Sequence, residues 1–118
     1  MSERTVNVAG TEVRFRSSAA IPRMYRLRFG RDIFREISEL QKDFEANKDG
    51  DMSDIAIDNL EKFENIAYIM AKHADPSIPD DIDEWLEQFE MFDIYTILPE
   101  ILQMWTENMA TDVAPKKK

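Results

Sequence analysis

The chain has no cysteine and a single histidine, His73, among its 118 residues. Without cysteine it cannot form disulfides, use a thiolate nucleophile or bind zinc through thiolates, and this composition suits a reducing compartment. His73 has no second His or Cys with which to share a metal. The sequence also lacks GxGxxG, phosphate-loop and GxSxG motifs, so we expect neither an enzyme nor a cofactor.

Glycine and proline are scarce, with 3 Gly and 5 Pro against 43% hydrophobic residues, which is typical of a folded chain with regular secondary structure. The N-terminus lacks the apolar segment of a signal peptide, and no apolar run approaches the roughly 20 residues that a membrane span needs. We therefore expect a soluble, intracellular protein. Its length predicts one domain at residues 1–110, followed by a flexible C-terminal tail at residues 111–118.

Arginine is absent after residue 35, although the formal net charge is −9. Residues 1–35 hold all eight arginines against three acids, a net +5, whereas residues 36–118 hold seven lysines against 21 acids, a net −14. The acidic majority would repel phosphates over a Debye length of about 8–10 Å, so we do not expect a nucleic-acid partner. Pairing of the arginines with acidic helices of the same chain is the simpler interpretation, and a head-to-tail contact between copies is the other.

The first elements are predicted by alternation and by capping residues. Alternating valine and phenylalanine on both sides of an Ala-Gly pair predict a β-hairpin at residues 4–16, whose apolar face should pack on helices. Pro22 then fits the first turn of a helix over residues 22–29. Gly30 suits a left-handed cap, and Asp32 can cap the following helix.

Helical periodicity continues over the rest of the domain, whose helical part spans residues 20–110. A polar loop at residues 45–54 precedes a central helix over residues 54–74, near whose end His73 can bond the last carbonyls. Asp81 can cap a short fourth helix, and Pro99 must kink the last helix or lie near its start. The predicted fold class is α+β, mainly α: a hairpin followed by about five helices in a compact helical domain.

The polar loop partly matches an EF-hand, because Glu45, Asn47 and Asp49 fall at positions 1, 3 and 5 and Gly50 at position 6. Position 12, which should be a bidentate Glu, is Ala56. We therefore expect no metal site.

Two segments, RMYRLRFGRDIFREISEL and LEKFENIAYIMAKHADPSIPDDIDEWLEQFEMFDIYTILPEILQMW, resemble the tail assembly chaperones of long-tailed phages and prophages of Gram-positive bacteria. The resemblance extends from the hairpin to Trp105. Its most specific residues are Tyr25, Arg26, Phe29, Gly30, Arg31, Asp32, Ala67, Tyr68, Met70, Trp85, Leu86 and Phe89.

The resemblance implies a non-enzymatic role in virion morphogenesis. Members bind the tape measure protein, a long helical chain that is prone to aggregation, and help tail tube protein subunits polymerise around it. They act in the cytoplasm of the bacterial host and are absent from the mature virion. Many also exist as a frameshifted longer form, and Lys116-Lys117-Lys118 can be encoded by the run of adenines that such slippage uses.

Within this interpretation we predict a partner or self-association surface at Arg23, Arg26 and Arg31, which would also serve a homo-oligomer. The family-pattern residues are interpreted as structural; they are Tyr25, Phe29, Gly30, Asp32, Tyr68, Trp85 and Phe89. The alternative function is an acidic DNA mimic or regulatory binding protein. The net charge suits a mimic, but Trp85, Leu86 and Phe89 are expected to interrupt its row of acids.

Overall fold

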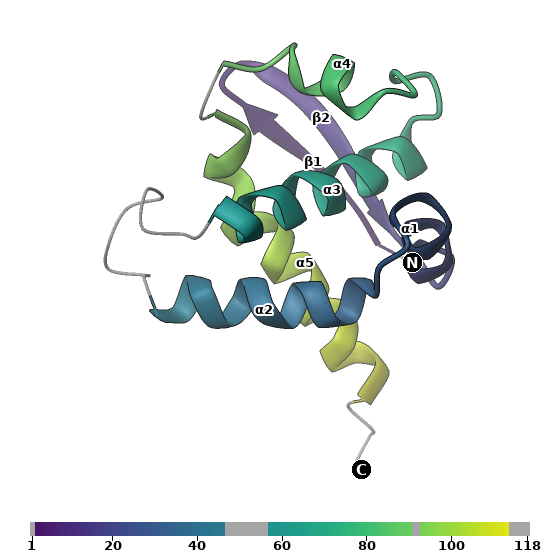
Figure 1. The fold of residues 1–118 in the computed structure, drawn as a ribbon, viewed down its shortest axis with the longest axis vertical. Coiled ribbons are helices and arrows are strands. Elements are labelled where there is room, and N and C mark those ends of the chain that lie inside the picture. The colour runs from purple at the N-terminus through teal and green to yellow at the C-terminus, as the bar shows by residue number, and fades with distance from the viewer. Residues whose placement is uncertain (1, 47–56, 91–92, 114–118) are drawn as a thin grey trace.

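The N-terminus forms an antiparallel hairpin of β1 (Ser2–Val8) and β2 (Thr11–Ser17), as predicted. The computed structural model describes residues 2–46, 57–90 and 93–113 (Figure 1). At the turn, Ala9 and Gly10 both have positive φ, 50° and 95°, a combination typical of tight two-residue hairpin turns. The backbone N–H of Gly10 donates to Oδ1 of Asn7 at 2.7 Å, which further fixes the turn.

One face of the hairpin is apolar and buried. Side chains alternate between the two faces of a strand, so Val6, Val8, Val13 and Phe15 all point to the same side. The long helix α3 (Ile57–Ala74) lies across this face (Figure 1). The prediction that helices cover the hairpin is therefore confirmed.

Helices α1 (Ile21–Phe29) and α2 (Ile33–Ala46) meet at a sharp corner. Gly30 ends α1 in the left-handed region at φ 69°, and its N–H donates to the carbonyl of Arg26 at 2.8 Å. Asp32 begins α2 by accepting the N–H of Phe34 at 3.0 Å. Both predicted caps are confirmed.

Helix α3 is central, as predicted, and six consecutive residues of it, 66–71, are buried. A helix that is apolar on all sides must be surrounded by other elements. The hairpin, α1 and α2 all pack on it (Figure 1). The predicted loop and the predicted start of this helix fall largely on residues 47–56, outside the described residues.

The chain ends in three helical elements: α4 (Ile82–Leu86), the 3₁₀ helix η2 (Asp93–Ile97) and α5 (Leu98–Val113). Asp81 caps α4 by accepting the N–H of Asp83 at 3.0 Å. Pro99 is the second residue of α5, where a missing N–H costs little, so it begins the helix rather than kinking it. Residues 111–113, predicted as tail, continue α5, and residues 114–118 lie outside the described part.

The buried hydrophobic side chains form one cluster. Trp85 attaches the short helix α4 to it, with its ring centre 5.6 Å from that of Tyr68 and 5.2 Å from that of Phe89, both edge-on. Edge-to-face pairs at this distance add to the gain from burial. Trp85 is therefore the buried anchor of α4, and Ile82 and Leu86 pack against the cluster beside it.

Replacing Gly30 by Ala should lower the free energy of unfolding by about 1 kcal/mol, because a left-handed conformation costs an L-residue roughly that much. No atom lies within 4 Å of the Cβ that would be added, so the cost comes from the backbone alone. Denaturant titration measures it. Gly30→Asn should lose less, since Asn tolerates this conformation, and equal losses for the two variants would contradict the assignment.

Candidate partner-binding surface

Three exposed side chains, those of Arg23, Arg26 and Leu27, share one side of α1, which we call the basic face. At about 100° per residue they lie opposite Ile21 and Tyr25, whose side chains are fully buried. Burial of that inner pair directs the basic face to solvent. Among the residues that the structure describes, neither Arg23 nor Arg26 forms an ion pair.

Arg31, the third residue of the predicted surface, has a partner inside the protein. Its Nε donates to Oε2 of Glu36, and the hydroxyl of Tyr25 donates to Oε1 of the same carboxylate. Glu36 is only 3% exposed, so its charge depends on these contacts. Arg31 therefore fixes the corner between α1 and α2, whereas Arg23 and Arg26 remain available to a partner.

The same contacts change the pKa values of the groups involved. The hydrogen bond to Glu36 and its negative charge raise the pKa of the Arg31 guanidinium. Burial, followed by the hydrogen bond to Glu36, raises the pKa of the Tyr25 hydroxyl. Tyr25 consequently remains a neutral donor to Glu36 at physiological pH.

Two large hydrophobic side chains are exposed within the described part of the chain, those of Leu27 (70%) and Phe34 (49%). Leu27 belongs to the basic face, and Phe34 lies near the start of α2 with its ring edge-on to Trp105, 5.9 Å between centres. The sequence-based prediction missed both residues. A signal was present, because Leu27 is out of phase with the buried positions Ile21 and Tyr25.

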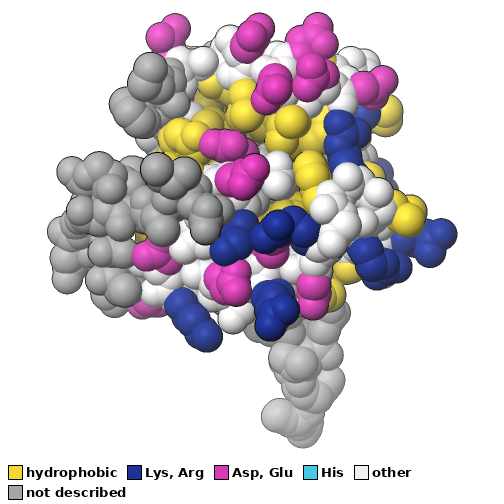
Figure 2. Space-filling model, viewed as in Figure 1, with side chains coloured by type: hydrophobic (Ala, Val, Ile, Leu, Met, Phe, Trp, Pro, Cys, Tyr) yellow, Lys and Arg dark blue, Asp and Glu magenta, His cyan; other side chains and the backbone are white. Residues whose placement is uncertain are grey.

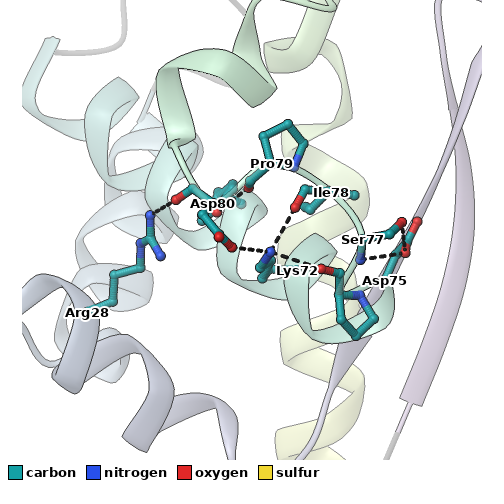
Figure 3. Close-up of polar contacts among 9 residues, drawn as sticks. Arg28, Lys72, Asp75, Ser77, Ile78, Pro79 and Asp80 are labelled. Carbon is teal, nitrogen blue, oxygen red and sulfur yellow. Dashed lines mark hydrogen bonds and ion pairs between the residues drawn. The ribbon is translucent and has the colours of Figure 1, made fainter.

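Arg28 points to the opposite side of α1 and joins it to the connection between α3 and α4. It donates to the carbonyl of Asp80, and its guanidinium lies 4.9 Å from the centre of the Tyr68 ring. Figure 3 shows Lys72 beneath the same connection, where its Nζ donates to the carbonyl of Ile78 at 2.7 Å and to Oδ1 of Asp80 at 2.6 Å. Lys72 lowers the pKa of Asp80 through this contact. Arg28 is thus unavailable to the basic face.

The residues of the family pattern lie in the core or at helix ends. Those in or against the core are Tyr25, Phe29, Tyr68, Trp85 and Phe89, and those at helix ends are Gly30 and Asp32. Each of these positions has a structural role that requires no partner.

A second charged surface covers α4 and the residues that flank it; we call residues 80–90 the acidic segment. Its six acids, Asp80, Asp81, Asp83, Glu84, Glu87 and Glu90, are all exposed. Figure 2 shows acidic side chains gathered over α4, and Lys and Arg lower down, over α1 and α2. Trp85 is only 1% exposed, so the expectation that it interrupts the exposed row of acids is wrong, whereas Leu86 and Phe89 are only partly buried and still lie within that row.

His73 differs from its predicted role at the end of α3. Its Nε2 lies 2.9 Å from the hydroxyl of Ser18, a hydrogen bond that ties the end of α3 to the segment between β2 and α1. Burial and the nearby charge of Arg16 lower the pKa of His73, so the ring is neutral at physiological pH. The residues on either side of His73 in the sequence cannot predict a contact with a residue so far away along the chain.

A cavity of about 390 Å³ lies between α2 and α5. Its lining residues are Gln41, Phe44, Glu45, Pro99, Leu102, Gln103 and Thr106. Glu45 is the one ionisable side chain in this lining, so the cavity offers no acid–base pair for catalysis.

No group of three or more His, Cys, Asp or Glu side chains in the described ranges could hold a metal ion. The part of the EF-hand-like loop at residues 47–56 lies outside those ranges. Over the same ranges, no helix combines the length and apolar character that crossing a membrane requires. Comparisons of the chain with protein families, with curated proteins and with solved structures find no match.

Tyr25→Phe should lower the free energy of unfolding by about 1.5–3 kcal/mol, since it removes a donor from a buried carboxylate. The matched control is Tyr95→Phe, because Tyr95 donates to Glu64 in the same way at a less buried site. Its loss should be smaller. Denaturant titration of both variants provides the comparison, and equal losses would show that burial of Glu36 contributes nothing.

All three tyrosines should ionise at higher pH in the folded protein than in the unfolded chain. Burial raises the pKa of Tyr25 and Tyr68, and burial with the hydrogen bond to Glu64 raises the pKa of Tyr95 to about 12. An unfolded tyrosine ionises near pH 10, so above that pH the folded state binds more protons and stability falls as pH rises. Ultraviolet absorbance of the phenolate, with and without urea, tests this; coincident titration curves would contradict it.

Proposed function

We propose that the protein is a non-enzymatic tail assembly chaperone, which binds the tape measure protein and helps tail tube subunits polymerise around it. The observation that supports this most is the basic face of α1, where two arginines that form no ion pair with any described residue lie beside an exposed leucine. The sequence resemblance described above supports the choice of partner.

The surface chemistry suits a helical partner that is prone to aggregation. Leu27 offers apolar contact area to the exposed hydrophobic stripe of such a helix, and Phe34, near the start of the next helix, is a second exposed apolar side chain. Arg23 and Arg26 can pair with acids beside that stripe. The remaining chain, with a net −14 over residues 36–118, would keep the complex soluble through repulsion between like charges.

The second candidate, an acidic DNA mimic or regulatory binding protein, is favoured by the exposure of all six acids of the acidic segment. The short length of α4 argues against a DNA mimic. Helix α4 has five residues, which at about 1.5 Å per residue span roughly 8 Å, whereas duplex DNA continues its charge at one per roughly 1.7 Å of axis. A mimic needs a longer regular array, so the chaperone is the better-supported proposal.

Co-expression with the tape measure protein of the same tail gene cluster tests the function. The tape measure protein should become soluble and co-purify with the chain. If it stays insoluble and unbound, both with this chain and with any frameshifted longer form, the proposed function is wrong.

Single substitutions test the surface in the same assay. Arg23→Glu and Leu27→Ser should each reduce the captured tape measure protein several-fold, because the first reverses a charge of the basic face and the second removes its apolar contact. Lys42→Glu is the control, since Lys42 is exposed farther along α2 and its reversal changes the net charge equally. Capture that is unchanged by Arg23→Glu and Leu27→Ser would exclude the basic face as the contact.

A further inference from the structure

We infer that the basic face of one copy binds the acidic segment of a second copy. The two surfaces are opposite in charge, and among the described residues most of their charged side chains form no ion pair. Within the described part of the chain, Asp80 is the one acid of the acidic segment that is ion-paired, with Lys72 at 2.6 Å. The inference does not depend on the proposed function.

The geometry of α1 prevents the two surfaces from pairing within one molecule. Arg28 faces the connection that leads into the acidic segment, where it donates to the carbonyl of Asp80. At about 100° per residue, Arg23 and Arg26 lie some 140–160° around the helix from Arg28. Because Tyr25 is buried on the inner side, α1 cannot rotate to bring them there. Among the described residues neither arginine pairs with an acid of the acidic segment, so these acids can meet the basic face on another copy.

The exposed leucine gives the contact an apolar component. Leu27, which is 70% exposed, would be buried against the acidic segment of the other copy, where Leu86 and Phe89 are only partly buried. Figure 2 shows hydrophobic side chains at the surface beneath the acids of α4. The contact thus combines ion pairs at its edge with apolar area at its centre, as protein interfaces generally do.

The net charge makes the contact weak but does not prevent it. Two copies at −9 each repel at long range, yet screening over about 8 Å at physiological ionic strength leaves local charge to decide the contact. The same screening weakens exposed ion pairs as salt increases. Self-association should therefore be concentration-dependent and weaker in high salt.

Sedimentation equilibrium measures the association, with charge reversal on each surface in turn. The basic-face variant carries Arg23→Glu and Arg26→Glu. The acidic-segment variant carries Glu87→Lys and Glu90→Lys. Glu87 caps the C-terminus of α4 and Glu90 follows it, and positive charge near a helix C-terminus stabilises the helix. Each variant alone should self-associate at least tenfold more weakly than the wild type, and Lys42→Glu should not. Circular dichroism and thermal melting verify that each variant is folded.

Mixing the two reversed variants is the decisive step. Their altered surfaces are again opposite in charge, so the mixture should recover association that neither variant shows alone. Wild-type protein that stays monomeric up to millimolar concentration, or a mixture that does not associate, would overturn the inference. If self-association is lost while tape measure capture is intact, the proposed function still stands. If capture is lost while self-association is intact, the inferred contact between copies still stands.

Discussion

The outward direction of the basic face depends on one buried carboxylate. Glu36 lies buried in α2, and a buried charge is tolerated only with partners, which Tyr25 and Arg31 supply from α1 and from the corner. The contact with Tyr25, together with the burial of Ile21 and Tyr25, fixes the rotation of α1 about its own axis. Once that rotation is fixed, Arg23, Arg26 and Leu27 must point to solvent. A polar contact in the interior thus determines the chemistry of the surface.

The cations of the chain have two different roles. Some cations tie elements together: Arg4 pairs with Glu100 at 2.8 Å between β1 and α5, and Lys62 pairs with Glu39 between α3 and α2. Such partly exposed pairs stabilise a protein little, so the fold rests on its apolar cluster. The arginines of the basic face do not join this network, and their charge is available for recognition. Internal pairing, the simpler interpretation of the sequence, therefore accounts for only some of the arginines.

Local features of the fold could be predicted because they depend on neighbours in sequence. The hairpin turn at Ala9-Gly10 and the caps at Gly30 and Asp32 are set by backbone preferences within a few residues. The separate roles of Arg23 and Arg31 could not be predicted in this way. They differ only because Glu36 is buried, and its burial depends on how α2 packs against α3.

Long-range contacts were the least predictable part of the site for the same reason. The hydrogen bond between Ser18 and His73 and the contact of Arg28 with Asp80 both join residues more than 50 positions apart. Charge counting identified the arginine-rich region but could not tell which of its cations faced solvent. The exposed leucine was visible only as a break in helical phase, and such breaks gain meaning once the buried side of the helix is known.

A weak surface is consistent with a temporary partner. The basic face offers one fully projecting leucine and two exposed cations, too little apolar area for a permanent interface. Under the proposed function the protein releases its client when the tail tube encloses it, and modest affinity favours release because affinity differences lie mostly in the dissociation rate. If a second copy covers Leu27 beforehand, the basic face is shielded from unspecific apolar contacts. A client whose hydrophobic stripe binds the face more tightly than the second copy would then displace that copy. Low affinity would then be a property that the proposed function requires.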